Sequence, residues 1–558
     1  MRVADAVARI LAAEGVDLLI GYPVNPLIEA AAAVGIRPII VRQERTGIHM
    51  ADAMSRMTSG QRLGVFAMQH GPGAENSFGG VAQAYADSVP ILLLPAGHDR
   101  REMGIAQNFR AVEAYRPITK WADELRVSAT LPDTMRRAFA QVRNGRPRPV
   151  MVEIPWDAWE DEIDPPDGYT PAIRARSAPD PAGIESAITL LLAAERPLIY
   201  AGQGVHYARA WEGLRRLAEL LGVPVTTSLQ GKSAFPEDHP LSPGSGGRSV
   251  SAALDAFVRD ADVVLGIGCS FTPTSYGIRW PVGKRYIHAT GDAADLDQGV
   301  HAEIGIVGDA GLVLDALVAC AEERLTASGA GTERAERVDR GRTVAAQIAS
   351  LNEPWRSAWA KKLRSDEVPL TPYRVISDLA ATVDIARTII THDAGSPRDQ
   401  LSPFWPATAP LSYIGWGKTT QLGTGLGYAL GAKLAHPDKL CINVMGDAAF
   451  GFTGLDFETA VRERIPILTV VLNNFSMAIE LEIMPISTER YRSTDISGDC
   501  AAIARALGGH GERVTQPHEI VPAIRRAVAA TEAGTPALLE FITSKEVALS
   551  LSGATNPD

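Results

Sequence analysis

Two oxygen-bearing side chains, Asp447 and Asn474, each follow an apolar run in the last third of the sequence. The first run, residues 440–445, leads into a turn of small residues around Asp447, and the second, residues 467–472, ends at Asn474. Carboxylate and amide oxygens suit a hard cation such as Mg²⁺, which commonly completes its coordination with phosphate. The spacing therefore suggests a metal site that also takes a phosphate group.

The residues around Asp447 fit the phosphate half of this site. Gly446, Ala448 and Ala449 are small, so backbone N–H groups can approach a phosphate closely, and a helical pattern follows. If both runs are parallel strands, their carboxyl ends open on the same edge of one sheet, where ligands usually bind. The competing interpretation is a strand–turn–helix with an ordinary Asx turn.

A third acidic residue, Glu44, lies far from this site in the sequence. It follows the apolar run 39–41 and precedes a helical pattern. Alone, it would be read as a surface carboxylate. Three further segments follow it: QHGPGAEN at 69–76, AYADSVP at 84–90 and RPITKW at 116–121.

The elements that must position these residues alternate along the whole chain. Short continuous apolar runs are separated by helical patterns, which predicts parallel sheets covered by helices on both faces. A proline-rich charged linker at 160–180 and an alanine-rich connecting helix at about 325–355 divide the 558 residues. We expect three α/β domains, at 1–160, 180–325 and 360–545, and a short tail at 546–558.

Composition excludes several classes of protein. The net charge of −11 argues against nucleic-acid binding, and no apolar stretch reaches membrane-spanning length. The four cysteines are far apart, which predicts free thiols rather than disulfides or a zinc site. We expect a cytoplasmic protein.

The Asp447–Asn474 segment resembles the signature of thiamine-diphosphate (ThDP) enzymes, with Ala448 at a position that is usually glycine. The segment around Glu44 resembles the one that carries the activating glutamate of the acetolactate synthase and pyruvate decarboxylase family. The blocks at 69–76, 84–90 and 116–121, together with 230–240 and 422–427, extend the resemblance over nearly the whole chain. It implies pyrimidine-binding, central and diphosphate-binding domains.

The resemblance assigns roles to particular residues. Glu44 would hydrogen-bond the aminopyrimidine ring, the Thr420 backbone would accept from that ring, and Leu422 would hold the cofactor bent. Mg²⁺ would be bound by Asp447, Asn474 and the Ser476 carbonyl. The other implied cofactor contacts are Pro23, Gly395, Ser396, Gly446, Ala448, Ala449 and Met477.

The resemblance also implies substrate-facing groups, namely Asn25, Gln69, His70, Gln107 and Glu480, with His392 and Arg398 as weaker candidates. The expected substrate is a 2-oxo acid, which is decarboxylated; ligation to a second carbonyl compound is left open as a further step. An acyl-CoA thioester, as in 2-hydroxyacyl-CoA lyase or oxalyl-CoA decarboxylase, is the alternative. A non-catalytic ThDP-binding regulatory protein is a remote third interpretation.

Two further expectations concern assembly and a second cofactor. In this family the glutamate and the metal site meet across a subunit interface, which implies a homodimer or homotetramer. The turn at 201–205, AGQGV, follows an apolar run in the central domain, where relatives bind FAD, ADP or nothing. One Gly-x-Gly is usually only a tight turn, so we expect this nucleotide site to be empty or vestigial.

Overall fold

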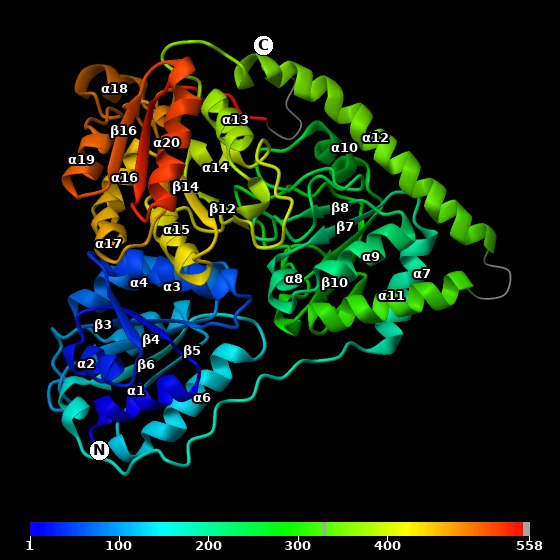
Figure 1. The fold of residues 1–558 in the computed structure, drawn as a ribbon. Coiled ribbons are helices and arrows are strands. Elements are labelled where there is room, and N and C mark those ends of the chain that lie inside the picture. The colour runs from blue at the N-terminus through cyan, green and yellow to red at the C-terminus, as the bar shows by residue number, and fades with distance from the viewer. Residues whose placement is uncertain (327–330, 551–558) are drawn as a thin grey trace.

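The computed structural model describes residues 1–326 and 331–550, so the end of the expected tail at 546–558 lies outside the described residues. Three sheets, each entirely parallel, are flanked by helices, and each is built from a separate part of the chain (Figure 1). This arrangement confirms the expected fold class.

The first sheet has six strands in the order β2-β1-β3-β4-β6-β5. Its strands are β1 (Leu18–Tyr22), β2 (Arg37–Ile40), β3 (Gly64–Met68), β4 (Ile91–Gly97), β5 (Trp121–Glu124) and β6 (Val150–Pro155). Its helices are α1 (Val3–Ala13), α2 (Asn25–Ala33), α3 (Glu44–Met57), α4 (Pro72–Ala86), α5 (Ala111–Tyr115) and α6 (Leu131–Arg143). The central strands are buried along their length, as their continuous apolar sequence requires.

The second sheet has five strands in the order β11-β10-β9-β7-β8. Its strands are β7 (Pro197–Ala201), β8 (Val225–Thr227), β9 (Val263–Ile267), β10 (Arg285–Thr290) and β11 (Ile304–Val307). Its helices are α7 (Pro181–Ala193), α8 (Gln203–Ala208), α9 (Trp211–Leu221), α10 (Ala252–Asp260) and α11 (Ala310–Thr326).

The third sheet has six strands in the order β13-β12-β14-β15-β17-β16. Its strands are β12 (Thr388–His392), β13 (Tyr413–Ile414), β14 (Leu440–Gly446), β15 (Leu468–Asn473), β16 (His510–Val514) and β17 (Ala537–Ile542). Its helices are α13 (Pro372–Thr382), α14 (Ser396–Leu401), α15 (Thr424–Ala435), α16 (Asp447–Thr453), α17 (Phe457–Arg462), α18 (Pro485–Tyr491), α19 (Cys500–Ala506) and α20 (Ile520–Glu532).

Two long connections join the three domains. Residues 164–180 have no regular helix or strand, and α12 (Gly331–Leu363) forms a long outer helix (Figure 1). The helix continues through Pro354, past the expected end near residue 355. Trp355 stacks on Phe404 with ring centroids 5.3 Å apart, and Trp359 packs on Tyr373 at 4.8 Å. These aromatic contacts with the third domain explain why the helix extends further.

The first and third domains share one hydrophobic core, in which α3 packs along α15. A Cβ at Gly427 would lie 2.6 Å from the His49 Cβ, and one at Gly431 would lie 2.2 Å from the Met50 carbonyl oxygen. Only glycine permits the two helices to approach this closely. Figure 1 shows α3 and α4 lying against α15.

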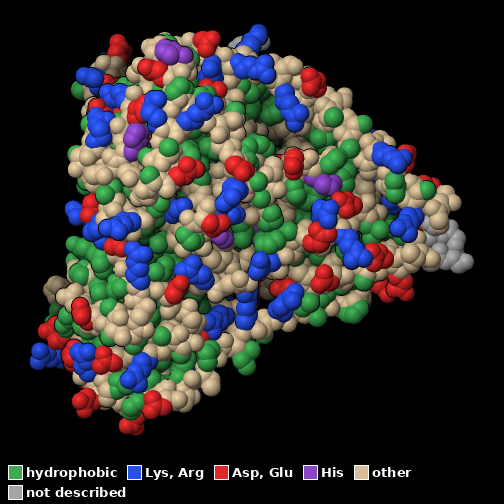
Figure 2. All heavy atoms as spheres, viewed as in Figure 1, with side chains coloured by type: hydrophobic (Ala, Val, Ile, Leu, Met, Phe, Trp, Pro, Cys, Tyr) green, Lys and Arg blue, Asp and Glu red, His purple; other side chains and the backbone are tan. Residues whose placement is uncertain are grey.

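The outer surface carries charges of both signs. Figure 2 shows Lys and Arg side chains interspersed with Asp and Glu on the face drawn, without a continuous basic stripe. Within the described residues, no helix is long and apolar enough to cross a membrane. All four cysteines are free thiols.

Candidate active site

The carboxyl ends of β12, β14 and β15 meet at one edge of the third sheet. His392 of β12 pairs with Val444 of β14, and Gly446 of β14 pairs with Leu472 of β15. The residues that follow these strands therefore lie side by side. They include the predicted groups Gly395, Ser396, Gly446, Asp447, Ala448, Ala449, Asn474, Ser476 and Met477.

Asp447 lies at the centre of this edge with one carboxylate oxygen unused. Its Oδ1 accepts the Ala448 N–H at 2.9 Å, while the buried Oδ2 has no hydrogen-bond partner. Burial raises the pKa of Asp447, and the backbone N–H groups of Ala448, Phe475 and Ser476 partly offset that rise. A buried carboxylate oxygen without a partner fits a site that is completed by a cation.

The loop after β15 brings the other two predicted metal ligands to the same place. The Ser476 N–H donates to Asn474 Oδ1 at 2.9 Å, which uses one of the two acceptor positions of that oxygen. Phe475 between them has a positive φ of 54°, which turns the loop back toward Asp447. The donor set of one carboxylate, one amide and one carbonyl oxygen suits Mg²⁺.

Open space surrounds two glycines of this edge. A Cβ on Gly446 would have no heavy atom within 4 Å, and one on Gly395 would meet only Pro397 Cδ at 4.0 Å. Gly395 also has a φ of +83°, which favours glycine. This space beside half-buried glycine backbone fits a bound diphosphate.

The segment Gly415–Gly423, called here the 415–423 loop, carries Thr420 and Leu422. The carboxylate of Asp393, at the end of β12, accepts the N–H groups of Gly423 and Gly425 at 2.9 and 2.8 Å. Burial raises the pKa of Asp393 to about 6. Leu422 is half-buried and contacts both the shared core and the cluster beneath α16.

Glu44 begins α3 and is buried in the first domain. Its Oε2 accepts from Asn76 Nδ2 at 3.2 Å, so the 69–76 turn contacts it. Burial raises the pKa of Glu44, and the nearby Asp456 raises it further. Its neighbour Arg45 donates from Nη2 to the Leu422 carbonyl oxygen at 3.2 Å.

The remaining predicted groups of the first domain lie near the carboxyl edge of its sheet or in a surface turn. Asn25 is exposed at the start of α2, Pro23 is half-buried after β1, and Gln107 is exposed in a turn beyond β4. Gln69 and His70 directly follow β3 and are half-buried. Within residues 1–326 and 331–550, no hydrogen bond or ion pair joins these residues or Glu44 to the Asp447 edge.

His70 belongs to a small aromatic cluster. Its ring lies 4.8 Å from that of His98 and 5.9 Å from that of Trp156, and His70 Nδ1 and His98 Nε2 are buried without partners. Burial and the neighbouring His70 lower the pKa of His98. Glu480 lies in the third domain, half-buried, six residues beyond Asn474.

Sequence reasoning missed His98, Asp393 and Gln83. His98 and Asp393 directly follow the strands β4 and β12, and this position could have revealed both. Gln83 is fully buried in α4 and bonds residues of the third domain. Only the packing of the domains identifies it.

The two weaker candidates, His392 and Arg398, both make contacts inside the protein. His392 stacks on Trp416, and Arg398 pairs with Asp399 while lying over the Tyr276 ring.

A cavity of about 820 Å³ lies where the central domain meets the other two. Its wall includes Tyr200, Phe271 and Trp280, and the cationic residues Arg146, Arg279 and Lys418. Gly204 lines the cavity, but the N–H groups of Gly202 and Gly204 donate to the carbonyl oxygens of Ile267 and Gly268 at 2.9 and 2.8 Å. The Gly-x-Gly turn is therefore structural.

Three family models match the chain. They describe the N-terminal TPP binding domain (residues 1–116), the central domain (residues 184–317) and the C-terminal TPP binding domain (residues 393–541) of thiamine pyrophosphate enzymes. The chain thus belongs to the thiamine pyrophosphate enzyme family and is a ThDP-dependent enzyme, which confirms the resemblance recognised in the sequence.

Individual relatives match over almost their full length. A probable acetolactate synthase large subunit of Methanocaldococcus jannaschii is 31% identical over 98% of this chain and 93% of the relative. Acetolactate synthase isozyme 3 large subunit of Escherichia coli K12 is 29% identical over 94% and 92%. Glyoxylate carboligase of Escherichia coli O157:H7 is 28% identical over 99% and 94%. These relatives do not favour the acyl-CoA alternative.

Proposed function

We propose that this enzyme is a Mg²⁺-dependent carboligase that decarboxylates a 2-oxo acid and joins the remaining fragment to a second carbonyl compound. The observation that carries the proposal is the edge formed by β12, β14 and β15, where the unpartnered Asp447 Oδ2 lies beside the 474–477 loop and open glycine backbone. Similarity to acetolactate synthases and a glyoxylate carboligase supports the choice of reaction.

Each group has a defined task in this proposal. ThDP supplies the carbanion chemistry that a protein side chain cannot. Asp447, Asn474 and the Ser476 carbonyl hold Mg²⁺ against the diphosphate, whose backbone contacts come from Gly395, Ser396 and residues 446–449. The Thr420 carbonyl, Leu422, Pro23 and Met477 position the rings.

Glu44 holds the proton that activates the aminopyrimidine. Its raised pKa suits this role because a general acid or base works best when its pKa approaches the working pH. The substrate side comprises Asn25, Gln69, His70, Gln107 and Glu480. His70 Nδ1 is buried and has no hydrogen-bond partner among the described residues.

We propose a homodimer as the minimum active unit, with a homotetramer as a further possibility for the assembly. The basis is the family resemblance, which implies that the glutamate of one chain and the metal site of another meet across a subunit interface. Sedimentation with and without ThDP would measure the assembly. An active monomer would overturn this part of the proposal. The expected cytoplasmic location stays a prediction.

The central cavity favours a bound nucleotide over the vestigial site expected from the sequence. Its volume of about 820 Å³ lies within the usual range for cofactor pockets, and its aromatic and cationic wall suits a ring system with phosphates. Burial lowers the pKa of Lys418 to about 8, which a bound phosphate would raise again. Titration with FAD and ADP, followed by fluorescence and calorimetry, tests this assignment.

A substrate screen with ThDP and Mg²⁺ tests the main proposal. Pyruvate, glyoxylate, longer 2-oxo acids and 2-hydroxyacyl-CoA thioesters would be compared, with detection of CO₂ and of the new carbon–carbon product. We expect CO₂ and a ligated product from a 2-oxo acid, and none from the Glu44→Gln variant. Turnover of thioesters alone would overturn the proposed substrate class.

A further inference from the structure

The 415–423 loop belongs to the third domain, yet its hydrogen bonds to side chains and backbone of the first domain run along its length. The contacts are Arg56 Nη1 to the Gly415 carbonyl at 3.2 Å, Thr419 Oγ1 to Gln83 Oε1 at 3.2 Å, Gln421 Nε2 to the Gly79 carbonyl at 2.7 Å, and Arg45 Nη2 to the Leu422 carbonyl at 3.2 Å. The first domain of the same chain therefore helps to position this loop.

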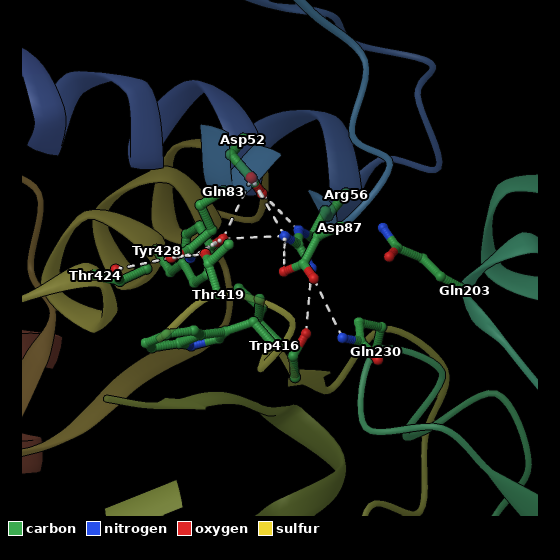
Figure 3. Close-up of polar contacts among 12 residues, drawn as sticks. Asp52, Arg56, Gln83, Asp87, Gln203, Gln230, Trp416, Thr419, Thr424 and Tyr428 are labelled. Carbon is green, nitrogen blue, oxygen red and sulfur yellow. Dashed lines mark hydrogen bonds and ion pairs between the residues drawn. The ribbon is translucent and has the colours of Figure 1, made fainter. Parts of the chain in front are cut away.

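Gln83 is the side chain at the centre of these contacts. It is fully buried in α4 and reaches across the domain boundary, as Figure 3 shows. Its Oε1 accepts from Thr419, the residue directly before Thr420, and its Nε2 donates to the Tyr428 hydroxyl at 2.9 Å. One amide thus links the loop to the helix that follows it.

The orientation of the Gln83 amide is fixed by its neighbours. The Tyr428 hydroxyl has one proton, which it donates to Asp52 Oδ2 at 3.2 Å, so it must accept from Gln83 and from Arg56 Nη2. The amide nitrogen consequently faces Tyr428, and the amide oxygen faces Thr419. A reversed amide would place its oxygen against the Tyr428 hydroxyl oxygen, whose only proton is donated to Asp52, so two acceptors would face each other.

The surrounding charges explain why a neutral side chain occupies this position. Asp52 and Asp87 both pair with Arg56, through bonds of 2.5 and 2.9 Å, and all three side chains are buried. Gln230 of the central domain donates to Asp87 Oδ1 at 3.2 Å. A third carboxylate at position 83 would add an uncompensated charge to a buried cluster.

We propose that Gln83 is a positioning residue. It holds Thr419, and through it the Thr420 carbonyl and Leu422, in the position that bound ThDP requires. The inference rests on the proposed function, since Thr420 and Leu422 are its proposed cofactor contacts. Gln83 touches neither the substrate nor the reacting atoms. Gln83 affects the affinity for ThDP and the degree to which the 415–423 loop is held in one conformation.

Variants on both sides of the Gln83–Thr419 bond test the proposal. Gln83→Leu removes all three hydrogen bonds of the amide, to Thr419, Thr424 and Tyr428. Thr419→Val removes only the Thr419 hydroxyl, and Thr419→Ser keeps it. Gln203→Leu is the matched control, because Gln203 lies near the same cluster but bonds Tyr207 instead of the loop (Figure 3). Calorimetry would measure ThDP binding with Mg²⁺ present, and hydrogen exchange would follow the backbone amides of residues 415–424.

Thr419→Val should weaken ThDP binding by about fivefold, the effect of one lost hydrogen bond, and Gln83→Leu by at least as much, because it also removes the bonds to Thr424 and Tyr428. The double variant should lose little more than Gln83→Leu alone, because the Thr419 bond is already absent there. Amide exchange in 415–424 should become faster in these variants, and kcat at saturating ThDP should change less than twofold. Thr419→Ser and Gln203→Leu should resemble the wild type.

Unchanged exchange and affinity in Thr419→Val would overturn the proposal, even if Gln83→Leu failed to fold. Equal losses of ThDP affinity in Thr419→Ser and Thr419→Val would also overturn the proposal, because they would show that the hydroxyl has no effect. A wild-type protein that binds no ThDP would instead contradict the proposed function. The exchange of residues 415–424 in the unliganded variants would still decide the role of Gln83.

Discussion

The carboxylate of Asp393 accepts the backbone N–H of Gly423 at 2.9 Å and so ties the end of β12 to the start of α15. The Gly425 N–H donates to the other oxygen of the same carboxylate. Asp393 therefore fixes the end of the 415–423 loop from within the third domain, while residues of the first domain bond Gly415, Thr419, Gln421 and Leu422.

Asp393→Asn should weaken ThDP binding by about tenfold, because an amide offers only one oxygen to three backbone N–H groups and turns an N–H₂ group toward another donor. Calorimetry with ThDP and Mg²⁺ measures the effect. Asp384→Asn, an exposed change at the opposite end of β12, is the control. Equal affinity of the two variants would contradict the prediction.

Glu44→Gln should slow proton exchange at C2 of bound ThDP by about a hundredfold, the lower end for loss of a general acid or base. Exchange into D₂O, quenched in acid and read by NMR, gives this rate without a substrate. Glu75→Gln, an exposed change on α4, should exchange like the wild type. An unaltered rate in Glu44→Gln would remove Glu44 from the activation step.

Asp447→Ala should abolish Mg²⁺-dependent ThDP binding, because the buried carboxylate is the only charged group among the three proposed ligands. Binding is compared with and without EDTA, and Asp438→Ala, an exposed change before the opposite end of β14, serves as the control. Retained Mg²⁺-dependent affinity would mean that the metal lies elsewhere.

Arg56→Met should lower the free energy of unfolding by about 3–5 kcal/mol, because Asp52 and Asp87 would remain buried without their shared cation. Arg216→Met, which breaks the exposed pair with Glu322, should cost at most about 1 kcal/mol. Urea unfolding followed by circular dichroism compares the two. Similar losses in both variants would show that the buried cluster contributes no more than a surface pair.

The raised pKa of Glu153 in β6 leads us to expect that the free energy of unfolding depends on pH. Burial, and next the neighbouring Glu124, raise its pKa from 4.5 to about 7. The native state therefore keeps a proton that the unfolded chain has released, so this residue lowers stability as pH rises from 4.5 to 7. The free energy of unfolding of Glu153→Gln, taken relative to that of the wild type, should rise by on the order of 3 kcal/mol between pH 4.5 and 8.

Thermal unfolding at both pH values checks the Glu153 prediction. Glu160→Gln, in the exposed segment after β6, should show the same pH dependence as the wild type. A constant difference between Glu153→Gln and the wild type across this range would mean that Glu153 is ionised at an ordinary pKa.

The edge that is proposed to bind the metal and the diphosphate could be predicted as a place in the fold because its signals are local. Asp447 and Asn474 each follow a continuous apolar run, and parallel strands place such residues on one edge. The same reasoning located Glu44 at the start of a helix. It could have found Asp393 and His98, which also follow strands, if polar residues after every strand had been considered.

The contacts between domains could not be predicted in this way. Gln83 bonds residues more than 330 positions later in the sequence, and Arg56 reaches Gly415 and Tyr428. Nothing in the periodicity of α3 or α4 specifies these partners. The central cavity is lined by all three domains, so the AGQGV turn alone gave no measure of its size.

The packing of α3 on α15 also determines the order in which the protein can fold during synthesis. About 370 residues separate the end of α3 at Met57 from the start of α15 at Thr424. At roughly 5–20 residues per second, the ribosome needs about 20–70 s to make this stretch. During that time the face of α3 around Met50 and Met54 has no partner from the third domain. The first domain therefore emerges with half of a core exposed, and this face is where chaperones would be needed.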